Sequence, residues 1–292
     1  MIAQKNLQDN KNIQVIQQLG NFQILEHQKD LSVSSLGAVN QYFAAKMNVK
    51  KRQLLINLNN TSYTVQAGAM QWTSGNVSMT SGVKGVGNFF GKMISSAVTG
   101  ESAVKPIYSG MGSLMLEPTY KHILLVDVSK WGTIVLDDGL FLACDSTLNH
   151  QVVARSNISS AVLGGEGLFN LSLSGNGIAA LECPVQADEL ISVNLQDDCL
   201  KIDGNMAIAW SGSLSFTVEK STKSLLGSAV SGEGFVNVFR GTGTVLMAPT
   251  IKENYLTASP SDSSSSNSPS NSKTQKLGNA LGTIGNVLDL FN

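Results

Sequence analysis

Short stretches in which apolar and polar residues alternate, separated by glycine-containing turns, run through the chain from residue 63 to residue 252. Residues 133–136 and 140–144 alternate in this way on either side of Asp138-Gly139, and residues 201–210 do so around Asp203-Gly204. Alternation places every second side chain on one face of a strand, and Asp-Gly favours a tight turn. Both segments therefore predict two strands joined by a turn, and we expect an all-β core.

This core shows an internal repeat of about 65 residues. A Ser-Ala-Val sequence precedes Gly-Glu three times, a Gly-x-Gly sequence follows nine or ten residues later, and a proline comes after it. The repeated residues are Gly100, Glu101, Gly110, Gly112 and Pro118; Gly165, Glu166, Gly175, Gly177 and Pro184; and Gly232, Glu233, Gly241, Gly243 and Pro249. Self-similarity at a fixed period indicates copies of one structural unit that share a core.

We therefore expect three units, at about residues 63–127, 128–195 and 196–256, in a pseudo-threefold arrangement. The repeated glycines are predicted to turn the chain or to let neighbouring backbones approach closely. Each proline is predicted to end the last strand of its unit, because proline cannot donate to a strand ladder. The three recurring glutamates could form a cation-binding ring, but a hydrogen bond to nearby backbone is the simpler alternative.

Residues 1–62 are predicted to form a strand and helix region that packs on this core. Strands are expected at 22–25 and 54–58, and Ser34 is a candidate cap for one N-terminal helix between them. That helix would carry Leu36, Val39, Phe43 and Met47 on one face. The basic triplet at residues 50–52 is expected to be a solvated helix end, with an anionic surface as the alternative partner.

Two further segments are candidate interaction elements. Within residues 83–98, Phe89, Phe90 and Met93 follow helical spacing, which predicts an apolar helix that packs on the core or contacts a partner or membrane. Residues 257–275 are rich in serine and predict a disordered linker. Residues 276–292 predict an amphipathic tail helix, with one apolar face formed by Leu277, Leu281, Ile284, Leu288 and Phe291. Its few charges favour a protein partner over a membrane.

The composition narrows the classes of function. Of the 292 residues, 42% are hydrophobic and 14% are charged, and the net charge of -1 argues against a strongly basic nucleic-acid binder. No secretory signal and no apolar run long enough to span a bilayer are visible, so we expect a cytoplasmic protein, with peripheral membrane contact as a further option. Cys144, Cys183 and Cys199 are expected to be reduced thiols in the core.

The sequence offers no catalytic, cofactor-binding or metal-binding residues that we would assign. Residues 85–92 are rich in glycine, but their spacing fits neither a dinucleotide-binding nor a phosphate-binding loop. His27, His122 and His150 lie far apart and lack the short spacing of metal ligands. No nucleophile motif is present, although Ser-His-Asp or Cys-His catalysis stays open. We expect no cofactor.

The ordered motifs resemble a known family. The threefold Ser-Ala-Val and Gly-Glu pattern, together with residues 66–72, 164–169 and 240–243, is similar to the Altered Inheritance of Mitochondria, or mitochondrial biogenesis, family of the TRAP-like superfamily. The resemblance covers about residues 20–252 and fits a bacterial-type member. It implies three tandem β-sandwich repeats similar to the tryptophan RNA-binding attenuation protein. The mitochondrial relatives are associated with inner-membrane organisation, and the family offers no agreed catalytic motif.

We therefore expect a non-enzymatic β scaffold that associates with itself or organises protein partners, including at a membrane surface. The alternative is an RNA-binding or small-ligand-binding protein, which rests on the TRAP-like fold alone. An enzyme of the hydrolase or metal-dependent kind ranks third.

Overall fold

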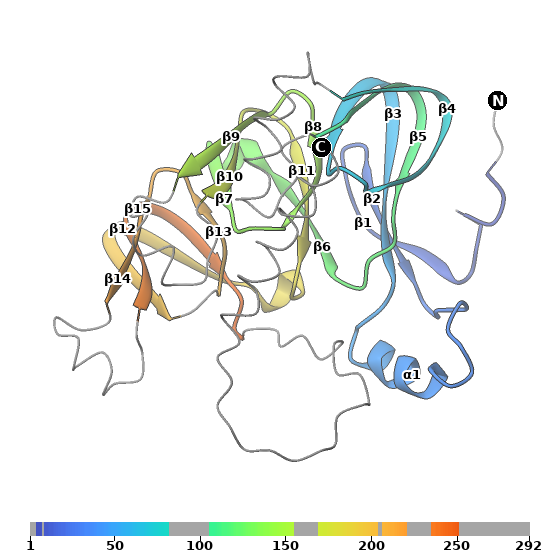
Figure 1. Cartoon of the computed structure of the whole chain (residues 1–292), viewed down its shortest axis with the longest axis horizontal. Coiled ribbons are helices and arrows are strands. Elements are labelled where there is room, and N and C mark those ends of the chain that lie inside the picture. The colour runs from blue at the N-terminus through green and yellow to red at the C-terminus, as the bar shows by residue number, and fades with distance from the viewer. Residues whose placement is uncertain are drawn as a thin grey trace, which may run out of the picture. The chain divides into compact units, whose positions relative to one another are not determined.

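The structure is a computed structural model that describes residues 4–7, 9–81, 105–154, 169–203, 206–220 and 235–250. The chain divides into two units, Met1–Lys252 and Glu253–Asn292, and every described residue belongs to the first unit. Strands dominate the described part of the chain, as Figure 1 shows, so the predicted all-β class is confirmed. The helices are α1 (Ala38–Lys46) and the short 3-10 turns η1 (Val128–Lys130) and η2 (Ala187–Glu189).

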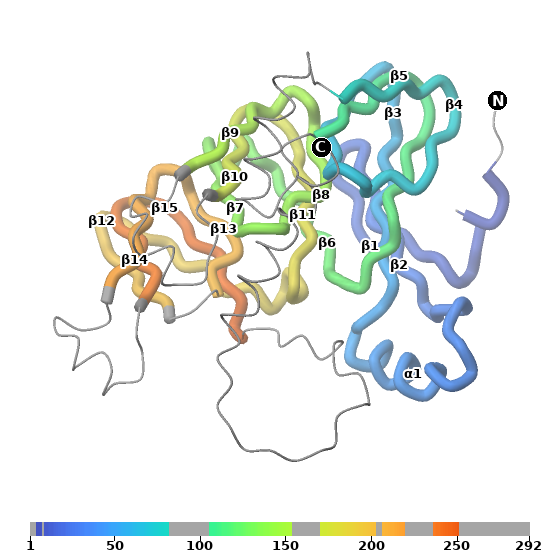
Figure 2. The backbone as a smooth tube through the Cα atoms, viewed as in Figure 1, coloured from blue at the N-terminus to red at the C-terminus, as the bar shows by residue number. Residues whose placement is uncertain are grey.

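The strands form two antiparallel sheets. The first has eight strands: β1 (Ile13–Leu19), β2 (Phe22–His27), β3 (Arg52–Val65), β4 (Met70–Thr80), β5 (Ile107–Leu116), β6 (His122–Asp127), β8 (Phe141–Asp145) and β11 (Ile178–Cys183). The second has seven: β7 (Thr133–Leu136), β9 (Asn149–Ala154), β10 (Phe169–Ser174), β12 (Ile191–Asp203), β13 (Ala207–Ser211), β14 (Ser215–Lys220) and β15 (Phe235–Met247). Figure 2 traces the chain through both sheets.

One pairing pattern occurs in three successive stretches of the chain. In the first, β5 pairs with β3 and with β4. In the last, β15 pairs with β12 and also with β13 and β14. In the middle stretch each long strand is split in two, so that β11 pairs with β6 and β8 while β10 pairs with β7 and β9. The pseudo-threefold arrangement of these stretches stays a prediction.

Two strand pairs join neighbouring stretches. The end of β3 pairs with β8, and the end of β7 pairs with β13. The apolar core also extends across the stretches. One cluster combines Leu54 and Leu114 of the first stretch with Leu125 and Ala180 of the second. Another cluster combines Val135 of β7 with residues of the third stretch. Neighbouring stretches therefore share both their sheets and their interior.

The sequence predicted that the repeated glycines turn the chain or let neighbouring backbones approach closely. In the structure, not all of the Gly-x-Gly sequences turn the chain. Gly110 and Gly112 lie inside β5, and Gly241 and Gly243 lie inside β15, which continues without a break. Residues 175–177 do interrupt the strand, and they separate β10, which belongs to the second sheet, from β11, which belongs to the first. This segment therefore carries the chain from one sheet to the other. The three prolines follow the ends of β5, β11 and β15, as expected.

The expectations for the N-terminal region are corrected in part. The predicted strands lie within β2 and β3, and Phe22 and Ile24 of β2 join the core. Ser34 does not cap the helix, because α1 begins after Gly37, which makes no side-chain cap. Leu36 consequently lies outside α1.

The basic triplet is also not a solvated helix end. Arg52 is buried, and Lys50 and Lys51 form ion pairs with Glu26 and Asp30. Cys144 and Cys183 are buried as expected, whereas Cys199 is exposed. The expected unit boundary at residue 63 falls inside β3, and the one at residue 196 falls inside β12.

Several predicted residues lie outside the described part of the chain. They are Gly100, Glu101, Gly165, Glu166, Gly232, Glu233, Phe89, Phe90, Met93, Leu277, Leu281, Ile284, Leu288 and Phe291. The predicted linker at 257–275 and the predicted tail helix at 276–292 lie there too.

Candidate functional site

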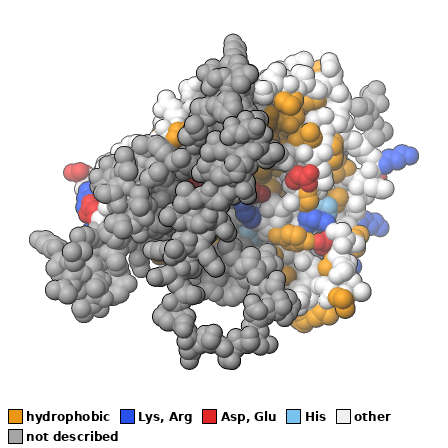
Figure 3. Space-filling view, viewed as in Figure 1, with side chains coloured by type: hydrophobic (Ala, Val, Ile, Leu, Met, Phe, Trp, Pro, Cys, Tyr) orange, Lys and Arg blue, Asp and Glu red, His pale blue; other side chains and the backbone are white. Residues whose placement is uncertain are grey.

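Helix α1 places apolar side chains in solvent. None of its nine residues is buried. We call the exposed apolar residues in and beside it the α1 surface: Leu31, Leu36, Val39, Tyr42, Phe43 and Met47. Leu36 is 93% exposed, Met47 77% and Phe43 63%. Figure 3 shows orange apolar side chains at the lower right, where Figure 1 places α1. Sequence spacing identified four of these residues, but spacing alone does not tell whether anything covers them.

A buried ion pair fixes the end of α1 to the first sheet. The Arg52 guanidinium donates to the Glu26 carboxylate, with Nη2 2.8 Å and Nε 3.1 Å from Oε2. The same Nη2 donates to the side-chain and backbone oxygens of Asn48, which follows α1, at 2.8 and 3.1 Å. Burial alone would raise the pKa of Glu26, but Lys50 and Arg52 hold it below its ordinary value. The helix is therefore held at its C-terminal end, while the described part of the chain buries none of its residues.

The loop before α1 is held by a second polar cluster. Asp30 accepts hydrogen bonds from Ser32, from Tyr120 Oη and from Lys51 Nζ, the last at 2.9 Å. The bonds from Ser32 and Tyr120 lower the pKa of Asp30. Burial, together with the bond to Asp30, raises the pKa of Tyr120 to about 12. Both groups therefore keep the protonation states that hold this loop across the physiological pH range.

A hollow beside α1 has a volume of about 540 Å³. Its lining combines the apolar residues Leu31 and Tyr42 with the side chains of Lys29, Lys46 and Lys50. Lys46 lies over the Tyr42 ring, with Nζ 5.3 Å from the ring centroid. Among the described residues, Lys29 and Lys46 have no carboxylate partner in an ion pair. The apolar α1 surface thus lies beside uncompensated positive charge.

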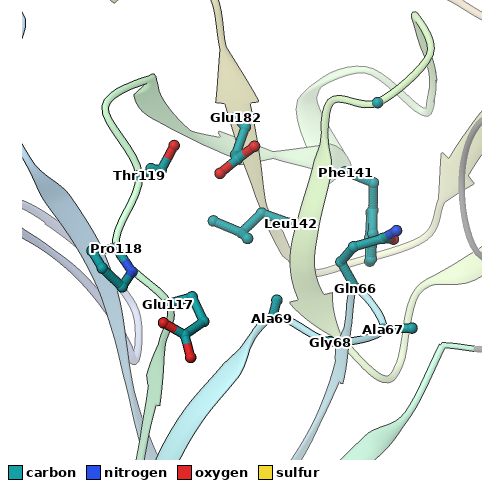
Figure 4. Close-up of a pocket in the computed structure, with 11 residues that line it drawn as sticks. Gln66, Ala67, Gly68, Ala69, Glu117, Pro118, Thr119, Phe141, Leu142 and Glu182 are labelled. Atoms are coloured by element: carbon teal, nitrogen blue, oxygen red, sulfur yellow. The ribbon is translucent and has the colours of Figure 1, made fainter.

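A second hollow lies where the first two stretches meet, and its volume is about 370 Å³. Figure 4 shows Glu117 and Glu182 at opposite ends, with the turn at Gly68 between the strands that line it. Glu182 accepts an ion pair from Lys121 at 2.7 Å. The lining contains Thr119 but no cysteine, histidine or lysine side chain. With Thr119 and the two carboxylates, it offers polar contacts to a small molecule.

Cys144 and His150 lie close enough together to be considered as a catalytic pair. The Cys144 Sγ lies 3.1 Å from His150 Nε2. Burial, with a smaller contribution from Asp145, raises the pKa of Cys144, and burial together with Lys105 lowers the pKa of His150. Both shifts favour the neutral thiol and the neutral imidazole, whereas a nucleophilic cysteine needs its thiolate. The contact is better suited to a core hydrogen bond than to acyl transfer.

The sites sought by sequence are otherwise dispersed. Within the described ranges, no three His, Cys, Asp or Glu side chains gather to hold a metal ion. His27 bonds to Gln53 at 2.9 Å, far along the chain from the other histidines. No described helix is long and apolar enough to cross a membrane.

Comparisons with known proteins identify the family. A family model described as mitochondrial biogenesis AIM24 matches residues 45–250. An uncharacterized protein of Streptococcus pyogenes serotype M6 is 29% identical over 192 residues, which cover 63% of this chain and 75% of that protein. The X-ray crystal structure of a Streptococcus pyogenes protein is similar with a TM-score of 0.51 and 25% identity, covering 69% of this chain and 88% of that one. The chain therefore belongs to the mitochondrial biogenesis AIM24 family, as a member of the bacterial type.

Proposed function

We propose that this protein is a non-enzymatic β scaffold of the cytoplasm, and that its α1 surface docks on a membrane with anionic headgroups. The exposure of Phe43 on a helix without a buried residue, and of Leu36 and Met47 beside its two ends, carries the proposal. A nine-residue helix is marginal in water unless it packs against something, so a covering surface would stabilise it.

The charges around α1 favour anionic lipid over neutral lipid. Lys29 and Lys46 line the hollow beside the helix, and Glu26 and Asp30 are already neutralised by Lys50, Arg52 and Lys51. A basic residue close to an anionic bilayer contributes about 1 kcal/mol of binding. Burying apolar side chains at the headgroup boundary adds to this attraction.

The non-enzymatic part of the proposal is supported by the chemistry of the described residues. The Cys144–His150 pair is held in its neutral form, and the lining of the polar hollow at Glu117 and Glu182 contains no cysteine, histidine or lysine side chain. The partners that we propose are therefore surfaces: a membrane, other proteins, or further copies of this chain.

We also propose that the three stretches are copies of one TRAP-like unit. The bulges support this equivalence, because the strands that follow the glycine turns share one irregularity. Each skips one residue against its partner strand, at Gln71 in β4, Leu142 in β8 and Ile208 in β13. A bulge recurring at the same place in three stretches is characteristic of a conserved structural plan rather than of chance.

Vesicle sedimentation tests the docking proposal. We expect the full chain to sediment with vesicles of phosphatidylcholine and phosphatidylglycerol, and only weakly with phosphatidylcholine alone. The double variant Leu36→Ser/Phe43→Ser should reduce binding at least about tenfold, because each exposed apolar side chain contributes about 1.5–3 kcal/mol when fully buried. Lys46→Gln should weaken binding to the anionic vesicles only.

The control is Val152→Ser, which removes another exposed apolar side chain, on β9 in the second sheet. We expect it to bind vesicles like the unaltered protein. Equal binding to both kinds of vesicle, no binding to either, or an unchanged Leu36→Ser/Phe43→Ser variant would contradict docking through α1.

A further inference from the structure

The two contacts that join neighbouring stretches have the same construction. At the first, Tyr63, Thr64 and Val65 of β3 lie opposite Asp145, Cys144 and Ala143 of β8. At the second, Ile134, Val135 and Leu136 of β7 lie opposite Ser211, Trp210 and Ala209 of β13. In each case the end of a long strand pairs with the strand after the glycine turn of the next stretch. We call these two contacts the closed junctions.

The first stretch contains the equivalent of one half of this contact, on an edge of β4 that pairs with no described strand. Ala143 and Ala209 both lie directly beside the bulge of their strand, opposite Ala180 and Leu246. Trp72 of β4 occupies the same place, beside the bulge and opposite Met115. Trp72, Thr73 and Ser74 therefore correspond to the residues of β8 and β13 that form the closed junctions.

The third stretch contains an unused copy of the other half. The same register identifies one strand-end residue in each stretch. It lies opposite the residue that comes nine positions before the one facing the bulge-side residue (Met115, Ala180 or Leu246). These strand-end residues are Val65, Leu136 and Ile202. Those opposite residues are Pro106, Leu171 and Asn237. All three of these aliphatic side chains are buried. Leu200, Lys201 and Ile202 of β12 therefore correspond to the strand ends of β3 and β7.

Both unused halves are free sheet edges among the described residues. There β4 pairs only with β5, and β12 pairs only with β15. The only hydrogen bond described there from outside the sheet is one from the Gln4 side chain to the Ser74 hydroxyl, at 2.7 Å. Thr73 and Lys201 are exposed, whereas Val135 and Trp210, which face each other in a closed junction, are 6% and 4% exposed.

We propose that β12 of one copy of this protein pairs with β4 of a second copy, which forms a third junction between chains. The pairing would be antiparallel, with Ile202 opposite Trp72, Lys201 opposite Thr73 and Leu200 opposite Ser74. The occupant is a second copy because each chain carries both halves of a contact that it already forms twice internally. The two halves are different surfaces, so each added copy presents a new free edge until the copies close into a ring, of two or more chains, or continue as a filament.

This inference rests on the proposed equivalence of the three stretches and not on membrane docking through α1. Its test is therefore carried out without lipid: if self-association is found but vesicle binding is not, only the docking proposal fails. Self-association without the charge dependence given below would instead contradict the junction.

The position opposite Lys201 offers a matched pair of substitutions on an exposed residue. Thr73→Lys places two like charges across the expected junction, and Thr73→Glu places opposite charges there. We expect light scattering after size exclusion to give masses above that of a monomer for the unaltered full chain and for Thr73→Glu. Thr73→Lys should raise the apparent dissociation constant at least about tenfold relative to Thr73→Glu. High salt should reduce this difference, because it screens exposed charges.

Reversing the partner charge confirms the register. Adding Lys201→Glu to Thr73→Lys should restore the mass of the unaltered protein. Far-UV circular dichroism should show equal folding of all variants, since Thr73 and Lys201 are exposed. A protein that is monomeric at every concentration, equal masses for Thr73→Lys and Thr73→Glu, or no rescue by Lys201→Glu would overturn the proposed junction.

Discussion

Glu26 and Arg52 show how one ion pair in the interior makes folding depend on pH. The carboxylate of Glu26 is buried and accepts from both Arg52 and Lys50, which hold its pKa below the ordinary value of 4.5. The unfolded chain therefore binds more protons at this group than the folded chain does. The resulting stabilisation is complete above about pH 4.5 and is lost as the pH falls through the lower, folded pKa.

Glu26→Gln should remove this dependence. At pH 7 the variant leaves Arg52 buried without its counter-charge, and losing one partner of a buried pair costs about 3–5 kcal/mol. We expect urea unfolding to show that the difference in unfolding free energy between the two proteins shrinks as the pH is lowered from about 7 to about 3. The control is Glu219→Gln, because Glu219 pairs with Arg240 on the surface, where a lost ion pair has a much smaller effect. A constant difference across this range would contradict the assignment.

The residue scale also marks the limit of sequence reasoning. The triplet at residues 50–52 was expected to be solvated, because three consecutive cations give no sign of a partner 24 to 26 residues earlier in the chain. The structure places Glu26 of β2 beside Arg52 of β3 because these strands are paired, with Glu26 directly opposite Arg52. Long-range pairing of this kind is invisible to local charge patterning. The exposure of Phe43 was missed for the same reason, since burial depends on what lies across the fold.

At the scale of elements, Gly110 shows why glycines recur inside strands that do not turn. Gly110 has a φ of +134°, and a Cβ at this position would lie 2.1 Å from the backbone oxygen of Asn76 in β4. Side chains other than hydrogen cannot occupy that space unless β4 and β5 separate. The sequence predicted either a turn or a close approach of two backbones here, and the close approach is confirmed.

Gly110→Ala should therefore destabilise the first sheet more than a glycine substitution in open space. The comparison is Gly68→Ala: Gly68 also has a positive φ, +80°, but nothing lies within 4 Å of its added Cβ. We expect Gly68→Ala to cost about 1–2 kcal/mol through backbone strain alone. Gly110→Ala should cost about 1–3 kcal/mol more, through overpacking against β4. Thermal and urea unfolding of the two variants measure this difference, and equal losses would show that the contact between the strands can relax.

Sequence reasoning was most successful for elements with strong alternation. Residues 133–136 form β7, and residues 141–144 of the second predicted strand lie in β8. The turn dipeptide at Asp138-Gly139 lies between these strands, although they belong to different sheets. It was least successful where the same local motif occurs in two different structural settings. Gly175 and Gly241 occupy equivalent motifs, yet the first lies where the chain changes sheets and the second lies within an uninterrupted strand. That choice depends on which sheet accepts the following strand, and no local signal encodes it.

At the scale of the whole molecule, the sharing of strands determines how the described core unfolds. The strand β8 completes the edge of β3, and β13 completes the edge of β7. The apolar clusters cross the same boundaries, since Ala209 of the third stretch packs with Leu136 and Leu173 of the second. Removing one stretch would expose a strand edge and part of a core in its neighbour. We therefore expect the three stretches to unfold together, although their local folds are alike.

The three tryptophans allow this cooperativity to be measured, because Trp72, Trp131 and Trp210 lie in the first, second and third stretches. Variants that keep one tryptophan and replace the other two with phenylalanine report on one stretch each. In every variant the fluorescence transition in urea should coincide with the transition in far-UV circular dichroism, because coincident probes indicate a single cooperative step. Comparison within a variant matters, since Trp210 is buried against Phe216 and Phe239 and its replacement lowers stability. A Trp210 signal that changes before the dichroism of the same variant would show that the third stretch unfolds independently, and that the pairing of β7 with β13 is too weak to couple the two.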